Sequence, residues 1–295
     1  MPNTIDKAKR YVPMLDEVYR ESAKTAVLES DSSMSRAGAN VNEIVIPKLD
    51  MNGLADYSRN DGYVKGDMSL TWETVIFNYE RGRMFTVDAI DNEETQDLAF
   101  GKLAGEFVRT KVVPEIDAFR FACIAGAEGI SKKEELLTAG DNVISALRTA
   151  TENLNEAEVP SESRILFITP TLKGMIDDLD SYKSKSVMGE FSQVVVVPQR
   201  RFYTAIKLND GKSEGETEGG YVKAEGAADI NFMVVHKAAV IQFTKHAVPK
   251  VIAPENNPDA DAYKYGYRNY GLCDVYENKA AGIYCSYAPV AEVSE

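Results

Sequence analysis

The stretch that decides the fold begins with VNEIVIPKL (residues 41–49) and continues with SLTWETVIFNY (69–79) and MFTVD (84–88). These segments are rich in β-branched and aromatic residues, as is typical of strands. The connection between the first two contains Asn52-Gly53 and Asn60-Asp61-Gly62, which are turn signals. The pattern predicts a long two-stranded arm with almost no core of its own. Because an isolated hairpin is marginally stable in water, the arm must lie on another part of the chain or on a second copy of it.

Large apolar side chains occupy both faces of the second predicted strand. Successive residues of a strand point to opposite faces. A hairpin with one face in water is expected to be polar on that face. Two interpretations follow: part of the arm is covered twice, with a neighbouring subunit on one side, or the arm packs on the chain's own sheet. The alternating sets are Leu70, Trp72, Thr74 and Ile76 on one face and Thr71, Glu73, Val75, Phe77 and Tyr79 on the other.

Short segments of this stretch resemble the extended-loop region of the major capsid proteins of tailed bacteriophages. The resemblance implies an α+β coat fold of the Hong Kong 97 type. Such a fold has an N-terminal arm, an extended β-hairpin loop, a long spine helix in a peripheral domain, and an α/β axial domain. The segments are, in order, IPKL (46–49), GLADYSR (53–59), GY (62–63), SLTWE (69–73), ERGRMF (80–85) and VD (87–88).

A long helix is predicted over residues 95–127, which the resemblance makes the spine helix. Pro114 lies in the middle of the pattern, and a proline inside a helix removes a backbone donor at a cost of ~3 kcal/mol. We therefore expect a kink or break at Pro114. The apolar residues recur at spacings near three and four, the period of a helix with one buried face: Leu98, Leu103, Ala104, Phe107, Val108, Val112, Ile116, Phe119 and Cys123.

Residues 131–235 are predicted to form a compact α/β unit, the axial domain of the resemblance. Ser131 and Glu134 have the spacing of a capping box, which predicts the start of a helix. A second helix is expected over residues 141–156, and Thr169-Pro170 supplies an N-cap and a first-turn proline for a third, ending near residue 179. Strands are expected at residues 164–168, 194–197, 202–208 and 230–235. Residues 209–220 read NDGKSEGETEGG and are predicted to be a solvent-exposed loop or hairpin tip.

The two ends of the chain complete this plan. Residues 1–40 are predicted to form an arm that lies across neighbouring subunits, with a frayed terminus as the alternative. Residues 236–295 contain strand-like segments rich in tyrosine and glycine, which the resemblance places back in the peripheral domain. The predicted division is therefore 1–40 (N-terminal arm), 41–92 (extended β-hairpin loop), 93–130 (spine helix of the peripheral domain), 131–235 (axial domain, with 209–220 exposed) and 236–295 (return to and completion of the peripheral domain).

The composition argues against some classes of protein. The chain of 295 residues has 33 basic and 46 acidic residues, for a formal charge of −13. This balance argues against a protein whose affinity comes from neutralising phosphates. It suits the wall of a shell that holds DNA without adhering to it, and solubility alone explains it equally well. No segment has the pattern of a signal peptide or the ~18 apolar residues of a membrane span. Cys123, Cys273 and Cys285 are too few and too scattered for a disulfide framework, so we expect buried, reduced thiols.

No catalytic, cofactor-binding or metal site is predicted. His236 and His246 lie ten residues apart, without the cysteine or carboxylate pattern that would complete a zinc site. Gly211-Lys212-Ser213 ends like a phosphate-binding loop, but the position of the required first glycine is Ile206.

Two weaker candidates are an acidic pair near the C-terminal strands and a lysine of the arm. Asp259 and Asp261 lack the glycine and the terminal glutamate of a calcium loop, although a loose cation site is an alternative. Some coat proteins of this fold form covalent Lys–Asn cross-links, for which the arm offers Lys65; we predict that no cross-link forms.

The sequence therefore predicts a structural protein and no enzyme. The expected function is that of a major capsid protein whose copies, as hexamers and pentamers, self-assemble into an icosahedral shell around a double-stranded DNA phage genome. A portal, and DNA bound without sequence specificity, are the other expected partners, with no membrane partner. A separate scaffolding protein is expected because the arm begins near Met1. The expected location is the virion, after synthesis in the bacterial host cytoplasm. The alternatives are an encapsulin-like protein compartment and a soluble α/β enzyme.

Overall fold

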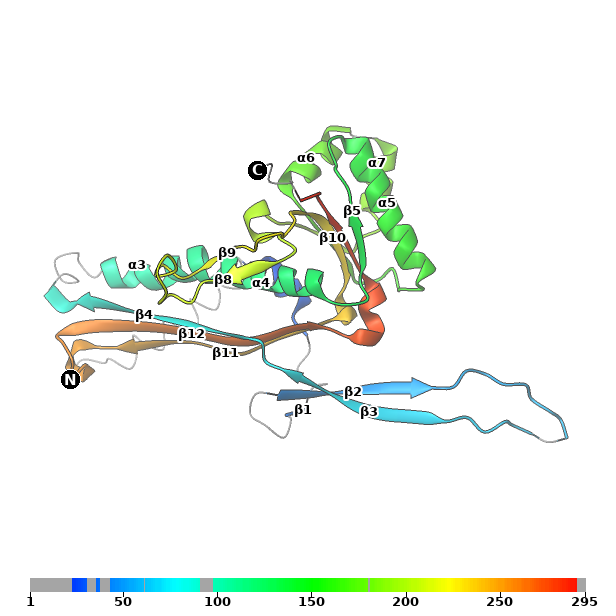
Figure 1. The fold of residues 1–295 in the computed structure, drawn as a ribbon, viewed down its shortest axis with the longest axis horizontal. Coiled ribbons are helices and arrows are strands. Elements are labelled where there is room, and N and C mark those ends of the chain that lie inside the picture. Colours follow the sequence, from blue (N-terminus) through cyan, green and yellow to red (C-terminus); the bar gives the residue numbers. More distant parts are fainter. Residues whose placement is uncertain are drawn as a thin grey trace.

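The computed structural model describes residues 23–30, 36–37, 43–60, 62–90, 98–179 and 181–290. Most of the predicted N-terminal arm, residues 1–40, lies outside these ranges. The fold is a mixed α+β arrangement. Figure 1 shows a long, narrow sheet, a second sheet with helices packed on it above one end of the first, and a hairpin that projects from the body.

Long antiparallel strands form the elongated part of the molecule (Figure 1). β12 (Ala262–Val275) lies between β11 (Val240–Ile252) and β4 (Tyr79–Asp88). A Cβ added to Gly82 of β4 would lie 2.9 Å from the Tyr267 carbonyl oxygen, so only glycine fits there. MFTVD (84–88), expected as part of the arm, thus belongs to this long sheet, because its full length pairs with β12.

The spine helix is continuous through the position where a break was expected. α3 (Leu98–Phe107) leads into a π-helical turn, Val108–Val112, and then into α4 (Val113–Gly126). The Val113 N–H donates to the Val108 carbonyl, a bond that spans five residues. Of the expected kink or break at Pro114, the break does not occur, because the wider turn just before Pro114 accommodates a residue that lacks a donor. The second α-helical segment, α4, does begin beside Pro114, as expected. Val108, Val113 and Ile116 of this helix pack on Tyr265 and Tyr267 of β12.

The second sheet, here called the central sheet, has the strand order β5-β13-β10-β6-β7 among the described residues. β10 runs antiparallel to β13 and β6, whereas the outer pairs β13–β5 and β6–β7 are parallel. The bounds are Ser131–Glu134 (β5), Arg164–Ile168 (β6), Gln193–Val196 (β7), Ile230–His236 (β10) and Ile283–Tyr287 (β13).

Two expectations about this region are wrong. Ser131 and Glu134 do not begin a helix, because pairing with β13 satisfies the backbone of residues 131–134 as a strand. The return of the chain to the long sheet is also incomplete. β11 and β12 lie in the long sheet, but β13 lies beside β10. Four of the five residues of β13 are buried, which fits a strand covered on both faces better than a sheet edge.

The central sheet is covered on both faces. On one face, Leu166 and Ile168 pack with α5 (Gly140–Glu156), α6 (Pro170–Leu179) and α7 (Tyr182–Met188). On the other face, Ile165 and Phe167 pack with Phe121 of α4. The predicted helices at 141–156 and after Thr169, and the strands at 164–168 and 230–235, are confirmed.

The predicted hairpin tip at residues 209–220 is also confirmed. It joins β8 (Ile206–Leu208) to β9 (Tyr221–Lys223), and most of its residues are exposed. The strand expected over 202–208 is limited to β8. Arg83 of β4 donates to the carbonyls of Thr217 and Glu218 at 3.1 and 3.3 Å, which ties the tip to the long sheet.

Part of the predicted N-terminal arm is built into the body of its own chain. The 3₁₀ turn Lys24–Leu28 places Leu28, which is fully buried, in the core shared by α4 and the central sheet. The Thr25 N–H and hydroxyl donate to the Asp117 carboxylate at 3.0 and 2.8 Å. Asp117 is itself fully buried on α4. This contact holds the start of the described chain against the spine helix.

Candidate interaction surface

The predicted hairpin is present and projects from the body (Figure 1). β2 (Glu43–Met51) pairs antiparallel with β3 (Met68–Ile76). Near the body, β1 (Arg36–Ala37) pairs with the other edge of β2. Beyond β1 the described hairpin is two strands wide, and an open strand edge tolerates the missing N–H of Pro47.

One face of the hairpin is anchored on its own chain. Ile44, Ile46 and Val75 are buried against Ile241 of β11 and Leu272 of β12. Burial of side chains of this size contributes roughly 1.5–3 kcal/mol each. The interpretation that the arm packs on the chain's own sheet is therefore correct for the base of this face. Towards the tip the same face becomes polar, with Lys48, Asp50, Ser69 and Thr71.

Charged side chains lie beside this anchored base. Lys48 donates to Glu277 at 2.9 Å, and this hydrogen bond raises the pKa of Lys48. Burial raises the pKa of Glu73. Exposed ion pairs of this kind contribute little to stability, so the apolar contacts at the base fix the position of the arm.

The opposite face carries an apolar stripe that no described residue buries. Cross-strand neighbours lie on the same face, and the register pairs Pro47 with Trp72, Leu49 with Leu70, and Met51 with Met68. Trp72 is 47% exposed and Leu70 is 53% exposed. We call this surface the arm stripe, defined as Pro47, Leu49, Met51, Met68, Leu70, Trp72 and Ile76.

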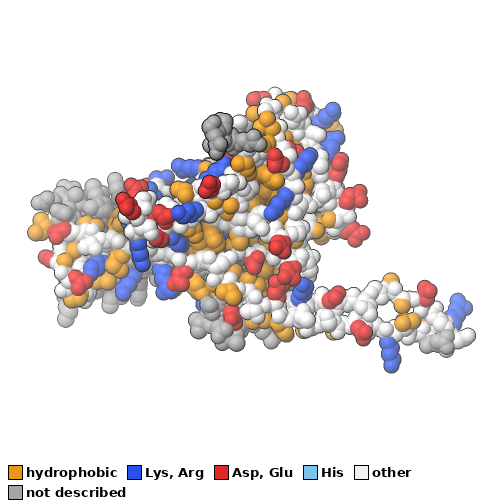
Figure 2. All heavy atoms as spheres, viewed as in Figure 1, with side chains coloured by type: hydrophobic (Ala, Val, Ile, Leu, Met, Phe, Trp, Pro, Cys, Tyr) orange, Lys and Arg blue, Asp and Glu red, His pale blue; other side chains and the backbone are white. Residues whose placement is uncertain are grey.

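The tip of the arm extends the exposed apolar surface. Leu54, Tyr57, Tyr63 and Val64 are all exposed, and the rings of Tyr57 and Tyr63 lie 4.9 Å apart. Figure 2 shows the arm as a slender projection on which hydrophobic atoms lie among acidic and basic side chains. Monomeric soluble proteins rarely expose large contiguous apolar patches, and such patches mark interaction surfaces. The arm stripe is therefore the candidate interaction surface of this chain.

Of the residues considered as metal ligands, those whose side chains the structure describes do not gather into a site. Burial lowers the pKa of His236, and the charges of Arg164 and Lys279 act in the same direction. His246 lies on β11 opposite Tyr270. Asp259 forms an ion pair with Lys264, so it is already partnered. In the part of the chain that the structure describes, no three His, Cys, Asp or Glu side chains gather in a group that would hold a metal ion.

Gly211-Lys212-Ser213 is used by its own loop. The Lys212 and Ser213 N–H groups donate to Asp210 Oδ1 at 2.7 and 2.8 Å, and the Ser213 hydroxyl donates to Asp210 Oδ2 at 2.5 Å. These bonds lower the pKa of Asp210 to about 2. The Asp210 carboxylate therefore already takes the backbone donors that a phosphate would need.

Lys65 and the cysteines differ in their exposure to solvent. Lys65 lies exposed in the connection between β2 and β3, and whether it forms a cross-link stays a prediction. The cysteines are free thiols, with Cys273 and Cys285 buried and Cys123 half-buried. The Cys123 thiol donates to the Cys273 carbonyl at 2.9 Å.

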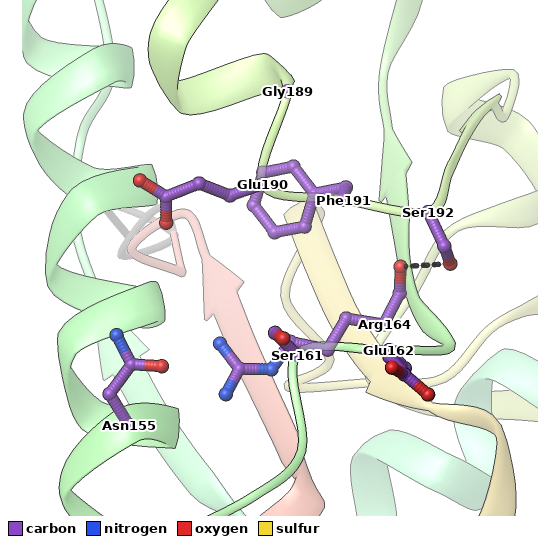
Figure 3. Close-up of a pocket in the computed structure, with 8 residues that line it drawn as sticks. All are labelled: Asn155, Ser161, Glu162, Arg164, Gly189, Glu190, Phe191 and Ser192. Atoms are coloured by element: carbon purple, nitrogen blue, oxygen red, sulfur yellow. Dashed lines mark hydrogen bonds between the residues drawn. The ribbon is translucent and has the colours of Figure 1, made fainter.

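A hollow of about 500 Å³ opens beside the end of α5. Figure 3 shows the Arg164 guanidinium reaching towards Asn155, with Glu190 on the facing wall. Arg164 Nε donates to the Pro160 carbonyl at 3.0 Å, and the Ser192 hydroxyl donates to the Arg164 carbonyl at 2.7 Å. Arg164 therefore holds the turn that leads into β6. The described lining has no paired nucleophile and base.

A polar cluster on the spine helix is absent from the sequence predictions. It centres on Asp117, which Thr25 and Arg201 approach from segments far away in the sequence. The sequence feature that could have identified this cluster is Asp117 itself, an acidic residue among apolar residues in the middle of the predicted long helix. Its partners lie 92 and 84 residues away, so no local spacing identifies them.

Comparisons with known proteins connect this geometry to a fold. No protein-family model and no curated protein matches the sequence. The mature capsid of bacteriophage PhiM1 aligns with a TM-score of 0.58 and 12% identity, over 86% of this chain and 83% of that chain. The capsid of cyanophage P-SCSP1u aligns with a TM-score of 0.56 and 12% identity, over 87% and 86% of the two chains. A virus-like particle from Pyrococcus furiosus aligns with a TM-score of 0.56 and 13% identity, over 96% and 100%.

These likenesses show the fold, at identities far below those that establish a shared function. The expected α+β coat fold is confirmed. The alignments cover most of this chain and of the neighbouring chains, so the likeness concerns the fold as a whole.

Proposed function

We propose that this chain, which has the fold of the phage capsid proteins, is the major capsid protein of a tailed bacteriophage. Copies of it self-assemble as hexamers and pentamers into an icosahedral shell around a double-stranded DNA genome. The observation that carries the proposal is the arm stripe, an apolar surface on a projecting hairpin whose side chains remain exposed among the described residues. The likeness to phage capsids supports the same conclusion.

The arm stripe is suited to a second copy of the chain. The buried residues Ile44, Ile46 and Val75 fix the base of the arm, so the exposed face is presented in one orientation. A preorganised arm loses less conformational entropy on binding than a free segment. In a closed symmetric assembly every copy buries the same surface. Many modest contacts of this kind would together stabilise a shell.

The proposal includes the other parts of a virion. We expect a separate scaffolding protein and a portal as partners, packaged DNA without sequence-specific binding, synthesis in the bacterial host cytoplasm, and a structural role without enzymatic activity. The long sheet with the spine helix would form the peripheral domain, and the central sheet with α5–α7 the axial domain. None of the described helices is both long and apolar enough to cross a bilayer.

A protein compartment is the second candidate. The observation in its favour is the alignment of the virus-like particle from Pyrococcus furiosus over 100% of its own chain. The two candidates differ in their contents. Copurification of an enzyme inside the particles would favour the compartment, and particles that take up DNA with phage partners would favour the capsid.

The test is assembly of the purified chain, followed by sedimentation and negative-stain electron microscopy. We expect shells, tubes or rings of five or six subunits from the natural sequence. Leu70→Ser with Trp72→Ser should abolish them while leaving the circular dichroism spectrum unchanged. The matched control is Ser69→Ala with Thr71→Ala, on the other face of the same strand, which should assemble normally. A natural chain that stays monomeric in every assembly condition, or stripe variants that assemble normally, would contradict the proposal.

A further inference from the structure

A hollow of about 350 Å³ on the spine helix is lined by basic side chains. Lys24 comes from the N-terminal 3₁₀ turn, Arg109 and Thr110 from the π-helical turn, and Arg200 and Arg201 from the turn Gln199–Arg201. The described residues that line it are all charged or polar. We call this hollow the basic pocket.

The charge of the basic pocket is opposite to that of the chain. Arg109 pairs with Glu106 at 2.7 Å, and Arg201 pairs with Asp117 at 3.2 Å. Four cations therefore face two carboxylates among these described residues, which leaves an excess of two positive charges. The chain as a whole carries a formal charge of −13. A local positive site in an acidic protein attracts anions to that site rather than to the whole surface.

The pocket is also held in place before any ligand arrives. Asp117 fixes the buried Arg201 side chain. The Tyr221 hydroxyl donates to the Arg200 carbonyl at 2.7 Å, and the Thr110 hydroxyl donates to the Glu106 carbonyl at 2.6 Å. The π-helical turn widens the helix where Arg109 and Thr110 project, and π turns within α-helices are frequent at functional sites.

We propose that the basic pocket binds phosphate groups of a nucleic-acid backbone. The planar guanidinium fork matches the geometry of phosphate oxygens, and this lining contains three such groups. A docked acidic peptide would be expected to place an apolar anchor in a pocket, whereas every described lining residue here is charged or polar and the lining is more polar than apolar. The inference rests on the proposed function, in which the shell encloses double-stranded DNA.

Such a site would act locally and without reading sequence. Contacts to phosphates carry no base information. Because the surrounding protein is acidic, the DNA would be held at one point on each subunit rather than along the whole wall. The pocket would therefore set where packaged DNA touches the shell without making the shell broadly adhesive.

The test uses a fluorescein-labelled 20-base-pair duplex of random sequence and the unassembled full chain, with anisotropy measured across a salt series. The pocket variant is Arg109→Gln with Arg200→Gln, two exposed side chains. The control variant is Lys111→Gln with Lys212→Gln, which removes equal charge outside the pocket. We expect the pocket variant to bind about tenfold more weakly and to lower the salt slope by about two, since each phosphate contact contributes ~0.9. The control should change affinity less than about threefold.

Three results would overturn the inference. One is an equal decrease in duplex affinity for the pocket variant and the control variant, which would mean that binding depends on the total charge of the chain. Another is no binding by the natural chain at about 50 mM salt. The third is displacement of the duplex by polyglutamate as effectively as by unlabelled duplex, which would identify a carboxylate ligand. Assembly of each variant is scored separately by sedimentation. If the natural chain forms normal shells but does not bind the duplex, only the proposal that the basic pocket binds phosphate is refuted. If the natural chain never assembles, the proposed function is refuted.

Discussion

Thr25 of the N-terminal segment is fastened to Asp117 of the spine helix by hydrogen bonds of 3.0 and 2.8 Å to one carboxylate oxygen. Arg201 donates to the other oxygen at 3.2 Å, and Arg120 donates to the Thr25 hydroxyl at 3.1 Å. A fully buried carboxylate is costly unless it is paired and hydrogen-bonded. This one is both, so it joins three distant segments at one point of the core.

Asp117→Asn is expected to lower the free energy of unfolding by ~3–5 kcal/mol, because it leaves the Arg201 charge buried without its counter-ion. The measurement is urea unfolding followed by circular dichroism. Asp177→Asn is the control, since Asp177 is an exposed acid paired with Lys173 one turn away on α6. Asp177→Asn should lower the free energy of unfolding by no more than ~0.5 kcal/mol. An equal decrease for the two variants would show that the buried ion pair stabilises the fold no more than the exposed one.

Gly140→Ala tests the contact between α5 and α6. A Cβ at Gly140 would lie 2.7 Å from Leu179 Cδ1 and closer still to the Met175 carbonyl oxygen, so the helices must separate. We expect Gly140→Ala to lower the free energy of unfolding by ~1–3 kcal/mol. Gly174→Ala on α6 meets no atom within 4 Å and should gain ~0.5–1 kcal/mol by favouring the helix. Thermal unfolding of the two variants should therefore shift in opposite directions.

The hairpin was predictable because its signal is local. The alternation around Trp72 and the turn residues near Asn60 lie within one short stretch. The sequence does not reveal which face is covered, because Val75 is buried by Leu272, almost two hundred residues later. The apolar pattern alone therefore left two interpretations. The structure shows packing on the chain's own sheet at the base of the arm, and cover by a neighbouring subunit stays a prediction.

The sequence predictions that differ from the structure also fail where contacts distant in the sequence decide the conformation. Ser131 and Glu134 match a capping box, but a long-range parallel pairing with β13 decides their conformation. Pro114 correctly indicates where the spine helix is irregular, but the missing backbone donor is accommodated by a π-helical turn and the helix does not break. The basic pocket joins segments around residues 24, 109 and 200, whose proximity depends on the complete fold.

Thiol reactivity should separate Cys123 from the other cysteines. A hydrogen bond from the Cys273 thiol lowers the pKa of Cys123, whereas burial raises the pKa of Cys285 to about 12. The thiolate is the reactive form, so a disulfide reagent near pH 8 should modify Cys123 first. Cys285 should react only after unfolding in urea. Persistence of the fast-reacting thiol in Cys123→Ser would contradict this assignment.

His236 should make the chain less stable in mild acid. Burial lowers its pKa below the ordinary histidine value of 6.5, so the unfolded chain takes up a proton at a pH where the folded chain does not. This contribution is full above the unfolded pKa and is lost as the pH falls through the lowered folded pKa. His236→Gln should flatten the decline in stability between roughly pH 7 and pH 5. Urea unfolding across that range, compared with the natural chain, measures the difference; identical slopes would exclude His236 as its source.

The arm should be the first site of proteolysis in the unassembled chain. Arg59 and Lys65 are exposed in the connection between β2 and β3, where the described backbone contacts include the Ser58–Gly62 pairing at 3.3 and 2.8 Å. Exposed loop tips are preferred cleavage sites because they can enter a protease without disturbing a core. Limited trypsin digestion with mass spectrometry should therefore find cuts after these residues before any others.

Assembly should remove that sensitivity. If the arm stripe is covered by another copy, the connecting loop is held against a neighbour, and shells should resist trypsin at concentrations that cut the free chain. Arg59→Gln with Lys65→Gln is the control, because it removes the cleavage sites and leaves the arm stripe intact. That variant should resist early cleavage in both states and assemble normally. Equal cleavage of shells and free chains at Arg59 would place the tip of the arm in solvent, so the subunit contact would be confined to the strands.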